Sequence, residues 1–376
     1  ISWCCFQTKS TRYHNILYAQ TPAAMVVTVD SSMNETISEE EAALYDRQIR
    51  LWGLEAQNRL KHSRILLQGV TPLSAEIAKN LVLAGIASMT IVDDRVATAE
   101  DVLNNFLIPH DAIGTTLACA SVQRTQTLNP MVKVSATPSF LTDGLTSKLK
   151  DYDVIIVTTD SFKEDLSFWE AFDHSVSDSE LSSPKPLLIL ATTLSCWGMA
   201  FLNLGNHEFV AEQITSKKLS GPTPTYVKSE ENSRTATTFV KTVANYPPLD
   251  ACLNLRWPSA KSEILPRHVP KGYFVMQVLR RCPSNTSPLT LQHLRSVWKD
   301  VAGALSVDES LLTDEDFLCC CGSSSASVNA ILGGVVSQEI VRAITGRGAP
   351  HGNWYFLNGL QCTTTVEWLP NGAISP

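Results

Sequence analysis

The stretch "RILLQGVTPLSAEIAKNLVLAGIASMTIVDD", residues 64–94, decides the fold. It opens with an apolar run of strand length, as expected of a strand that is covered on both faces. A short turn separates this run from "LSAEIAKNLVLAGI", in which apolar residues recur at the spacing of a helix. A second apolar run then ends in Asp93 and Asp94. Strand, turn, helix and strand in this order, with acids after the second strand, outline a dinucleotide-binding unit.

The turn itself departs from the dinucleotide-binding fingerprint G-x-G-x-x-G. Gly69 occupies the first glycine position, but Thr71 and Ser74 stand at the other two. A side chain at the second position crowds the approach of phosphate, and Pro72 lacks the N–H group that an anion would bind. We therefore predict that this turn does not hold a nucleotide by itself. Any contact that it retains is expected at Gly69 and at Asp94, near the ribose position.

Strand and helix patterns continue to alternate beyond this unit. Apolar strand runs occur in "VKVSATPSF", "DVIIVTTD" and "PLLILATT", and helical patterns in "LTSKLKDY" and "KEDLSFWEAFDHSV". Alternation of this kind predicts an α/β fold with a doubly wound, mostly parallel, Rossmann-like sheet. We expect antiparallel additions at two places. These are "CWGMAFLNLGNHEFV", as paired antiparallel strands, and a terminal hairpin made of "NWYFLNGL" and "TTTVEWLP".

Composition and pattern divide the chain into five segments. They are a disordered extension (1–36), the first segment of the α/β domain (37–213), a flexible loop (214–237), a small inserted region of mixed, mainly helical character (238–318) and a return to the α/β domain (319–370). The loop is rich in Ser, Thr, Pro and Lys, a composition that does not support a packed core. The return begins with a long apolar helix containing Gly333 and Gly334, which permit close packing at a cost in helix propensity.

The first helix of the folded part begins with a capping box. Ser38 is followed by Glu41, and three glutamates lie in the first turn, where they suit the helix dipole. We expect a helix that carries Leu44, Tyr45 and Ile49 on its apolar side and ends before the next glycine.

Composition disfavours several classes of protein. A net charge of −7 disfavours a nucleic-acid binder, and no apolar run approaches the ~20 residues that span a membrane. The ten cysteines include no C-x-x-C pair, so we expect no zinc and reduced thiols. Cys196 and Cys252 lack a basic neighbour that would activate a thiol, and His207 has no accompanying acid or cysteine motif. We predict structural roles for all three.

Motifs between Ser38 and Leu369 resemble the ubiquitin-like activating enzyme family, which has the ThiF/MoeB-type fold. They are "YDRQIRLWG", "AEIAKNLVLAGI", "NFLIP", "LNP", "NLGNHEFV" and "GGVVSQEIVRAIT". Within that family, the chain is most similar to the small, regulatory subunits of SUMO-activating heterodimers. The resemblance implies adenylation of the SUMO C-terminus with Mg-ATP, then thioester formation on a cysteine of the catalytic subunit and transfer to a conjugating enzyme. It also implies that this chain is the pseudo-catalytic half, because Asn104 of "LNNF" stands where active halves carry an arginine.

The resemblance assigns one catalytic residue to this chain. Arg47 of "YDRQIR" is implied to reach across the heterodimer to the partner's ATP, and Arg50 is the fallback on the same helix. From the residues alone, Arg47 is equally a solvated side chain that pairs with a nearby glutamate. Leu51, Trp52 and the "GGVVSQEI" helix serve core packing, subunit association or both. The resemblance further implies that ATP and Mg are bound mainly by the catalytic subunit, and that the chain is nuclear, with the cytoplasm as an additional location.

Other functions stay open at this point. The chain could be the regulatory subunit of another ubiquitin-like activating enzyme, or a self-sufficient ThiF/MoeB-like adenylyltransferase acting as a homodimer. The latter needs an intact glycine turn, its own arginine after the acids and, usually, zinc cysteines, and all three are missing from the sequence. An NAD-dependent oxidoreductase is disfavoured by the same turn, and a non-enzymatic scaffold is the remaining alternative.

Overall fold

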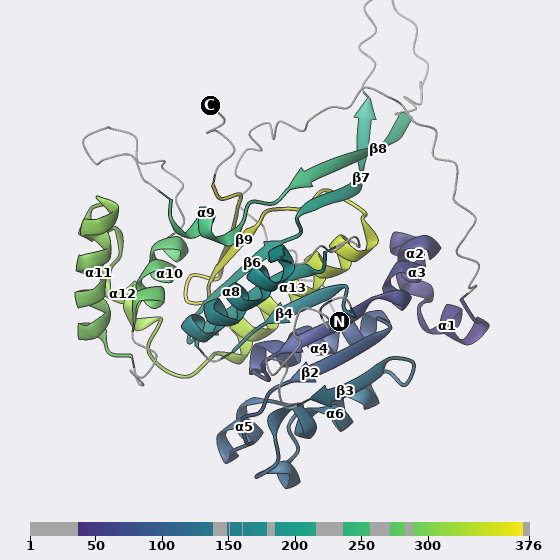
Figure 1. The fold of residues 1–376 in the computed structure, drawn as a ribbon, viewed down its shortest axis with the longest axis horizontal. Helices are drawn as coiled ribbons and strands as arrows, with labels where there is room; N and C mark the ends of the chain where they lie inside the picture. The colour runs from purple at the N-terminus through teal and green to yellow at the C-terminus, as the bar shows by residue number, and fades with distance from the viewer. Residues whose placement is uncertain are drawn as a thin grey trace, which may run out of the picture.

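The computed structural model describes residues 37–137, 149, 151–159, 161–178, 185–215, 236–255, 271–282 and 289–370. The elements follow in the order α1 (Glu39–Leu44), α2 (Asp46–Trp52), α3 (Leu54–His62), β1 (Arg64–Gln68), α4 (Pro72–Ala84), β2 (Ser88–Val92), α5 (Ala99–Asn104), η1 (His110–Ala112), α6 (Leu117–Leu128), β3 (Lys133–Thr137), β4 (Val154–Val157), α8 (Phe162–Asp178), β5 (Leu187–Leu194), β6 (Trp197–Asn203), β7 (Asn206–Thr215), β8 (Ala236–Asn245), α9 (Leu249–Leu253), α10 (Lys271–Arg281), α11 (Leu291–Leu305), η2 (Glu309–Leu311), α12 (Asp314–Leu318), α13 (Ala326–Thr345), β9 (Trp354–Asn358) and β10 (Thr363–Glu367). Figure 1 shows α1–α3 and α10–α12 at opposite ends of the molecule.

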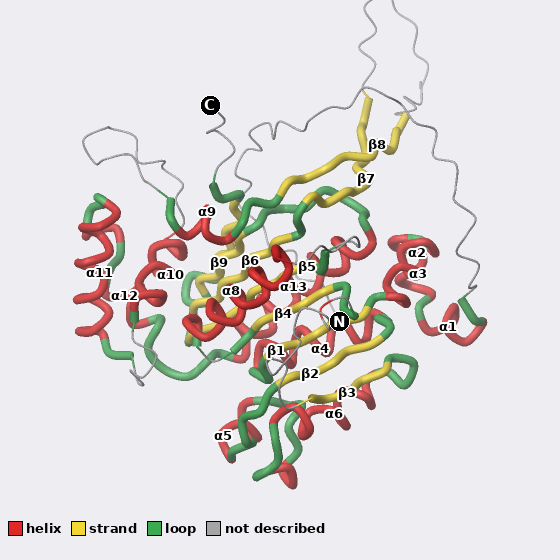
Figure 2. The backbone as a smooth tube through the Cα atoms, in the orientation of Figure 1, coloured by secondary structure: helices red, strands yellow, loops and turns green. Residues whose placement is uncertain are grey.

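The central sheet has the order β10-β9-β6-β5-β4-β1-β2-β3. Figure 2 shows the strands of this sheet at the centre of the molecule with helices around them. Strands β1 to β5 run parallel to one another, whereas β6, β9 and β10 join antiparallel. This order confirms the predicted α/β class, with a mostly parallel sheet and antiparallel additions. The chain passes from β1 to β2 on one side and later returns to β4 on the other. The carboxyl ends of β1 and β4 therefore form the switch point, where open α/β sheets bind ligands.

Alternate residues of each strand face two separate cores. Ile65 and Leu67 of β1 belong to the core shared with α4 and α13, whereas Leu66 belongs to the core shared with α8 and α10. This alternation explains why the central strands are continuous apolar runs in the sequence, since both faces are covered. The helical patterns predicted for α4, α8 and α13 are confirmed, and α10 and α11 lie in the region expected to be mainly helical.

The predicted first helix is interrupted. The Ser38–Glu41 capping box forms, but α1 ends at Leu44 and α2 starts after Tyr45, whose backbone leaves the helical region at φ −100° and ψ 13°. Tyr45 turns inward and is buried, while Leu44, expected on the apolar side, is exposed. The prediction of one continuous helix was wrong because the burial of the tyrosine ring redirects the chain.

The predicted pairing of "CWGMAFLNLGNHEFV" with itself was also wrong. Strand β6 inserts between β5 and β9 in the main sheet, whereas β7 pairs with β8 in a separate two-stranded ribbon. Both strands exist, but β6 pairs with β5, which directly precedes it, and with β9 near the end of the chain, whereas β7 pairs with β8. The ribbon projects from one side of the body (Figure 1) and occupies both ends of the predicted 214–237 loop, since β7 extends to Thr215 and β8 begins at Ala236.

Several predictions fall on residues that the structure does not describe. They are the disordered extension (1–36), the centre of the loop (216–235) and nearly all of the helix expected in "LTSKLKDY". The division into five segments stays a prediction. Among the described residues, no helix is both long enough and apolar enough to cross a membrane.

The close packing expected at the glycine pair of α13 occurs at only one of its members. A Cβ atom added to Gly333 would lie 2.6 Å from Cβ of Glu76 on α4, whereas one added to Gly334 would meet none of the described residues within 4 Å. The first glycine therefore lets α13 approach α4.

We predict opposite effects for the two alanine substitutions at this pair. Gly333→Ala is expected to destabilise the fold by about 1–3 kcal/mol through overpacking against α4. Gly334→Ala is expected to be neutral or to stabilise by up to about 1 kcal/mol, because alanine is the better helix former. Urea denaturation of both variants measures the difference, and equal free energies of unfolding would contradict the contact.

The last strand carries a half-buried acid. Glu367 of β10 lies opposite Trp354 of β9, and burial raises the pKa of its carboxyl from 4.5 to about 7. Between these two pH values, the folded chain therefore holds a proton that the unfolded chain has released.

We expect Glu367 to make stability depend on pH. Its stabilising effect is fully present below pH 4.5 and is lost as the pH rises through about 7, where the half-buried group becomes charged. Glu367→Gln should remove this dependence and raise the free energy of unfolding at pH 8. Glu170→Gln, at an exposed position of α8, is the control and should leave the pH profile of stability unchanged.

Candidate functional site

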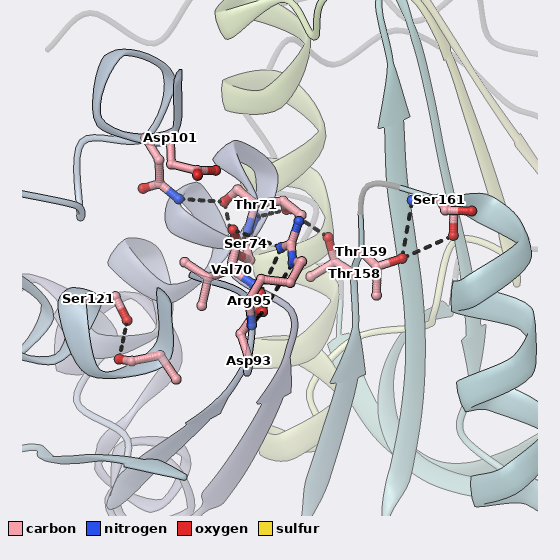
Figure 3. A network of polar contacts seen from close by, with 12 residues as sticks. Val70, Thr71, Ser74, Asp93, Arg95, Asp101, Ser121, Thr158, Thr159 and Ser161 are labelled. Atoms are coloured by element: carbon pink, nitrogen blue, oxygen red, sulfur yellow. Dashed lines mark hydrogen bonds and ion pairs between the residues drawn. The ribbon is translucent and has the colours of Figure 1, made fainter. Parts of the chain in front are cut away.

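The turn after β1 lies tightly against the end of β4. Gly69 adopts φ +94°, and a Cβ atom added there would lie 1.8 Å from the carbonyl oxygen of Thr158. The hydroxyl groups of Thr71 and Thr158 also lie 3.0 Å apart (Figure 3). Only glycine fits this conformation and this contact, so Gly69 has a structural explanation in addition to any role toward a ligand.

Most of the amide groups in this turn are used within the chain. The N–H of Val70 donates to Oδ2 of Asp93 at 2.7 Å. The N–H of Thr71 donates to Oγ of Ser74 at 2.8 Å, and the N–H of Ser74 donates to Oγ1 of Thr71 at 3.1 Å. Thr71 and Ser74, which replace two glycines of the fingerprint, therefore form a capping box for α4. The N–H of Leu73 is the remaining donor without a hydrogen bond to a described residue.

The acid nearest to the turn is neutralised by an arginine. Asp93 is 4% exposed, and its two carboxylate oxygens accept from Nε and Nη2 of Arg95 at 3.1 and 2.7 Å (Figure 3). The next residue, Asp94, points into solvent and is not part of this network. Of the two candidate nucleotide contacts, the structure therefore brings Gly69 to the turn but not Asp94.

These contacts do not fit a nucleotide at the switch point. A phosphate needs several free N–H groups at the start of α4, and a ribose hydroxyl needs a free carboxylate. Here the donors are bound to Asp93, Thr71 and Ser74, and the carboxylate is bound to Arg95. The side chains that replaced the glycines occupy the hydrogen bonds that a ligand would make.

A second group of contacts holds α2 and α3 against the far end of α4. The last carbonyl groups of a helix have no partner inside it. Nε2 of Gln48 on α2 donates to the carbonyl of Leu83 at 3.3 Å, and Nε2 of Gln57 on α3 donates to that of Ala84 at 2.9 Å. Gln57 is buried and also accepts from the indole of Trp52 at 3.1 Å. The half-buried Trp52 therefore belongs to this anchor.

Arg47 lies on the outer side of the anchored helix. Its side chain is exposed, and no hydrogen bond or ion pair joins it to any part of the chain that the structure describes. Arg50, the fallback, pairs with Asp46 at 3.0 Å in an exposed contact of little energetic value. Leu44 and Leu51, before and after Arg47, are also exposed, Leu51 by 76%. Among the described residues, Arg47 is thus a cation without an ion-pair partner, flanked in the sequence by exposed leucines.

Arg47 and the turn lie near opposite ends of α4. Helix α4 begins at the turn and runs back along β1 for 13 residues, or about 20 Å. Since Gln48 contacts the last turn of α4, Arg47 lies roughly that far from Gly69. Arg47 therefore cannot act at the turn of its own chain.

The cysteines and the histidine considered from the sequence lie in packed surroundings. Cys252 is buried with its thiol 2.8 Å from the carbonyl oxygen of Leu369, and burial raises the pKa of that thiol to about 11. Cys196 is half-buried at the end of β5, and His207 is buried beside Phe209, where burial lowers the pKa of the imidazole. These environments agree with structural roles. In the described residues, no group of three His, Cys, Asp or Glu side chains is arranged to hold a metal ion.

Sequence reasoning missed two of the residues that shape these regions. Arg95 was not considered, although it follows the acids directly in "DDR". Asn129 belongs to the "LNP" motif, but its sequence context indicated no structural role. In the structure, its Nδ2 donates to the hydroxyl of Tyr45 at 2.7 Å. The spacing of 84 residues between Tyr45 and Asn129 hides this contact from any local pattern.

Comparison with known proteins gives a consistent picture along the chain. The pattern of the ThiF family matches residues 45–369. The chain is 37% identical over 353 residues to SUMO-activating enzyme subunit 1 of Xenopus tropicalis, which covers 89% of this chain and 97% of that protein. It is 36% identical over 347 residues to SUMO-activating enzyme subunit 1 of Homo sapiens, with 89% and 96% covered. The crystal structure of selenomethionine PaaA matches with a TM-score of 0.50 at 14% identity, covering 90% and 76%, which concerns the fold alone.

The ion pair at the turn should be worth more than an exposed pair. We expect Arg95→Gln to lower the free energy of unfolding by about 1 kcal/mol or more, because the buried Asp93 loses its cation. Arg50→Gln removes the exposed pair with Asp46 and should change it by less than about 0.5 kcal/mol. Chemical denaturation compares the two variants, and equal losses would refute the stabilising role of Arg95.

Proposed function

This chain belongs to the ThiF family, with the SUMO-activating enzyme subunit 1 proteins as relatives along most of its length, and we propose that it is the regulatory subunit of a heterodimeric SUMO-activating enzyme. In this proposal, it completes the ATP site of the catalytic partner for adenylation of the SUMO C-terminus, before thioester transfer. The chain is then pseudo-catalytic and inactive alone. The conjugating enzyme is an indirect partner, through the catalytic subunit.

The observation that carries this proposal is the placement of Arg47. A permanently charged guanidinium stands without an ion-pair partner among the described residues, on a helix fixed to the body, and about 20 Å from the turn of its own chain. Such a group is suited to an anionic site on another molecule. The closed turn supports the same division of roles, since its own hydrogen-bonding groups are used internally.

The mechanism assigned to this chain is electrostatic. ATP, held with Mg by the partner, would supply the adenylyl group: the C-terminal carboxylate of SUMO would form a bond to the α-phosphorus while the bond to the β-phosphate breaks and pyrophosphate leaves. Arg47 reaches the phosphates from across the interface and offsets the negative charge that develops during transfer. An arginine side chain supplies this charge without a proton transfer.

The neighbours of Arg47 suit a protein interface. Leu44, Leu51 and Leu54 are exposed by 56%, 76% and 53%, on α1, α2 and the first position of α3. Apolar side chains around an arginine exclude water when a partner covers them, and this strengthens the charge interaction at the centre. We assign these leucines to the contact with the catalytic subunit.

The location of the chain is proposed from the resemblance alone. We propose a nuclear location, with the cytoplasm as a second compartment. Imaging of a tagged full-length chain tests this, and exclusion from the nucleus would overturn it.

The decisive test reconstitutes the reaction. The chain, the catalytic subunit, SUMO and Mg-ATP are mixed, and SUMO-adenylate and SUMO-thioester on the partner are followed in single turnover. We expect Arg47→Ala to slow adenylation by about 10²-fold or more, because a group that contacts only the transition state lowers the rate without preventing assembly. Co-purification of the two subunits should be unchanged.

Two controls give the test its specificity. Arg50→Ala changes an arginine on the same helix and should slow adenylation less than threefold. An unchanged rate for Arg47→Ala refutes its role, and a selective loss with Arg50→Ala transfers that role to Arg50. Adenylation by the chain alone, or by the partner without the chain, would overturn the function as a regulatory subunit and would favour a self-sufficient adenylyltransferase or a scaffold.

A further inference from the structure

Tyr45 occupies the point at which the helix of Arg47 begins. It is the residue that separates α1 from α2, and its carbonyl accepts the first hydrogen bond of α2, from the N–H of Ile49 at 2.9 Å. Its side chain is 6% exposed although it lies two residues before the exposed Arg47. The backbone that starts α2 and the buried ring are therefore parts of one residue.

Two contacts fix the buried side chain of Tyr45. Its ring lies against Gly85, where an added Cβ atom would stand 2.5 Å from Cζ of the ring. Its hydroxyl accepts a hydrogen bond from Nδ2 of Asn129 at 2.7 Å. The same Nδ2 donates to the carbonyl of Val82 at 2.9 Å, in the last turn of α4. Asn129 thus joins the start of α2 to the end of α4.

The position of α2 depends on the contacts of Tyr45 because the helix is too short to be stable without tertiary contacts. Helix α2 has seven residues, which is below the length at which a helix is stable by itself. At its other end, Gly53 adopts φ +90° under the guanidinium of Arg347. The start of the helix is held by Asn129, a residue from a distant part of the chain, and Arg47 lies within one turn of this attachment.

We propose that Tyr45 is a positioning residue for Arg47. This inference rests on the proposed function of Arg47. The hydroxyl of Tyr45, held by Asn129, sets the start of α2 and so the path of the Arg47 side chain toward the partner. A reacting group displaced by about 1 Å loses on the order of 10²-fold in rate, so a smaller shift is enough for a measurable effect.

The smallest change that tests this is Tyr45→Phe. It removes only the hydroxyl, while the ring stays on Gly85 and Asn129 keeps its bond to Val82. We expect the rate of SUMO adenylation at saturating ATP to fall roughly tenfold, by a displacement below 1 Å. The KM for ATP and the Kd of the catalytic subunit should stay unchanged, because binding does not depend on the precise path of Arg47.

A matched control comes from the other face of the sheet. Tyr273 of α10 is also buried, and its hydroxyl donates to the carbonyl of Cys252 at 3.3 Å. Tyr273→Phe therefore removes a buried hydroxyl of the same kind far from α2. It should lower the melting temperature about as much as Tyr45→Phe but leave the adenylation rate within twofold of the unmodified protein.

A double-mutant cycle separates positioning from general stability. If Tyr45 acts through Arg47, then Tyr45→Phe should cause no further loss of rate in a chain that already carries Arg47→Ala. Gln48→Met, which removes the bond to the carbonyl of Leu83 from within α2, should behave in the same way and serves if Tyr45→Phe folds poorly. A tenfold loss that persists in the Arg47→Ala background would overturn the inference, as would a full rate for both single variants.

The outcomes also distinguish the positioning role of Tyr45 from the proposed function of Arg47. If Arg47→Ala itself leaves adenylation unchanged, the proposed function fails and the positioning role fails with it. If Arg47→Ala slows adenylation but Tyr45→Phe and Gln48→Met do not, only the positioning role is lost.

Discussion

The last turn of α4 leaves carbonyl groups without partners inside the helix, and satisfying them organises the part of the molecule that we consider functional. Side chains from three separate segments donate to three consecutive carbonyls. The pairs are Asn129 with Val82, Gln48 with Leu83 and Gln57 with Ala84. The bonds to Val82 and Ala84 are buried, where an unpaired carbonyl would cost about 1–3 kcal/mol, and the bond to Leu83 is exposed. Together they hold α2, α3 and the loop after α6 at one place, and α2 carries the exposed arginine.

At the opposite end of α4, the first N–H groups also need hydrogen-bond partners, and side chains close in the sequence supply them. A dinucleotide-binding turn leaves its N–H groups free for phosphate, and Gly69 alone of the three glycines remains here. Thr71 and Ser74 cap each other, and Asp93 takes the N–H of Val70 and the charge of Arg95. Both ends of one helix are therefore completed within the chain. At one end, the turn uses its hydrogen-bonding groups internally, and the other end anchors the helix that carries Arg47.

Prediction from the sequence succeeded where a pattern is local and failed where a distant contact changes it. The helical period of α13 and the apolar runs of β1 and β4 could be predicted, because these elements bury the same faces regardless of which residues pack against them. The break at Tyr45 depends on Asn129 and Gly85, which no window around Tyr45 contains. The same limit explains the wrong pairing of β6, because a strand between β5 and β9 has the same alternation as one in a hairpin.

The sequence by itself determined the α/β class and the altered glycine turn, because both depend on neighbouring residues. The role of Arg47 came from the resemblance and stays a proposal. The tertiary structure alone decided that Asp93 rather than Asp94 faces the turn, and that Arg95 neutralises it. It also decided that Arg47 and Gly69 lie at opposite ends of α4, because the length and direction of that helix set the distance between them. Hydrogen bonds between residues far apart in the chain fix these positions, and the partners in such bonds are known only once the chain has folded.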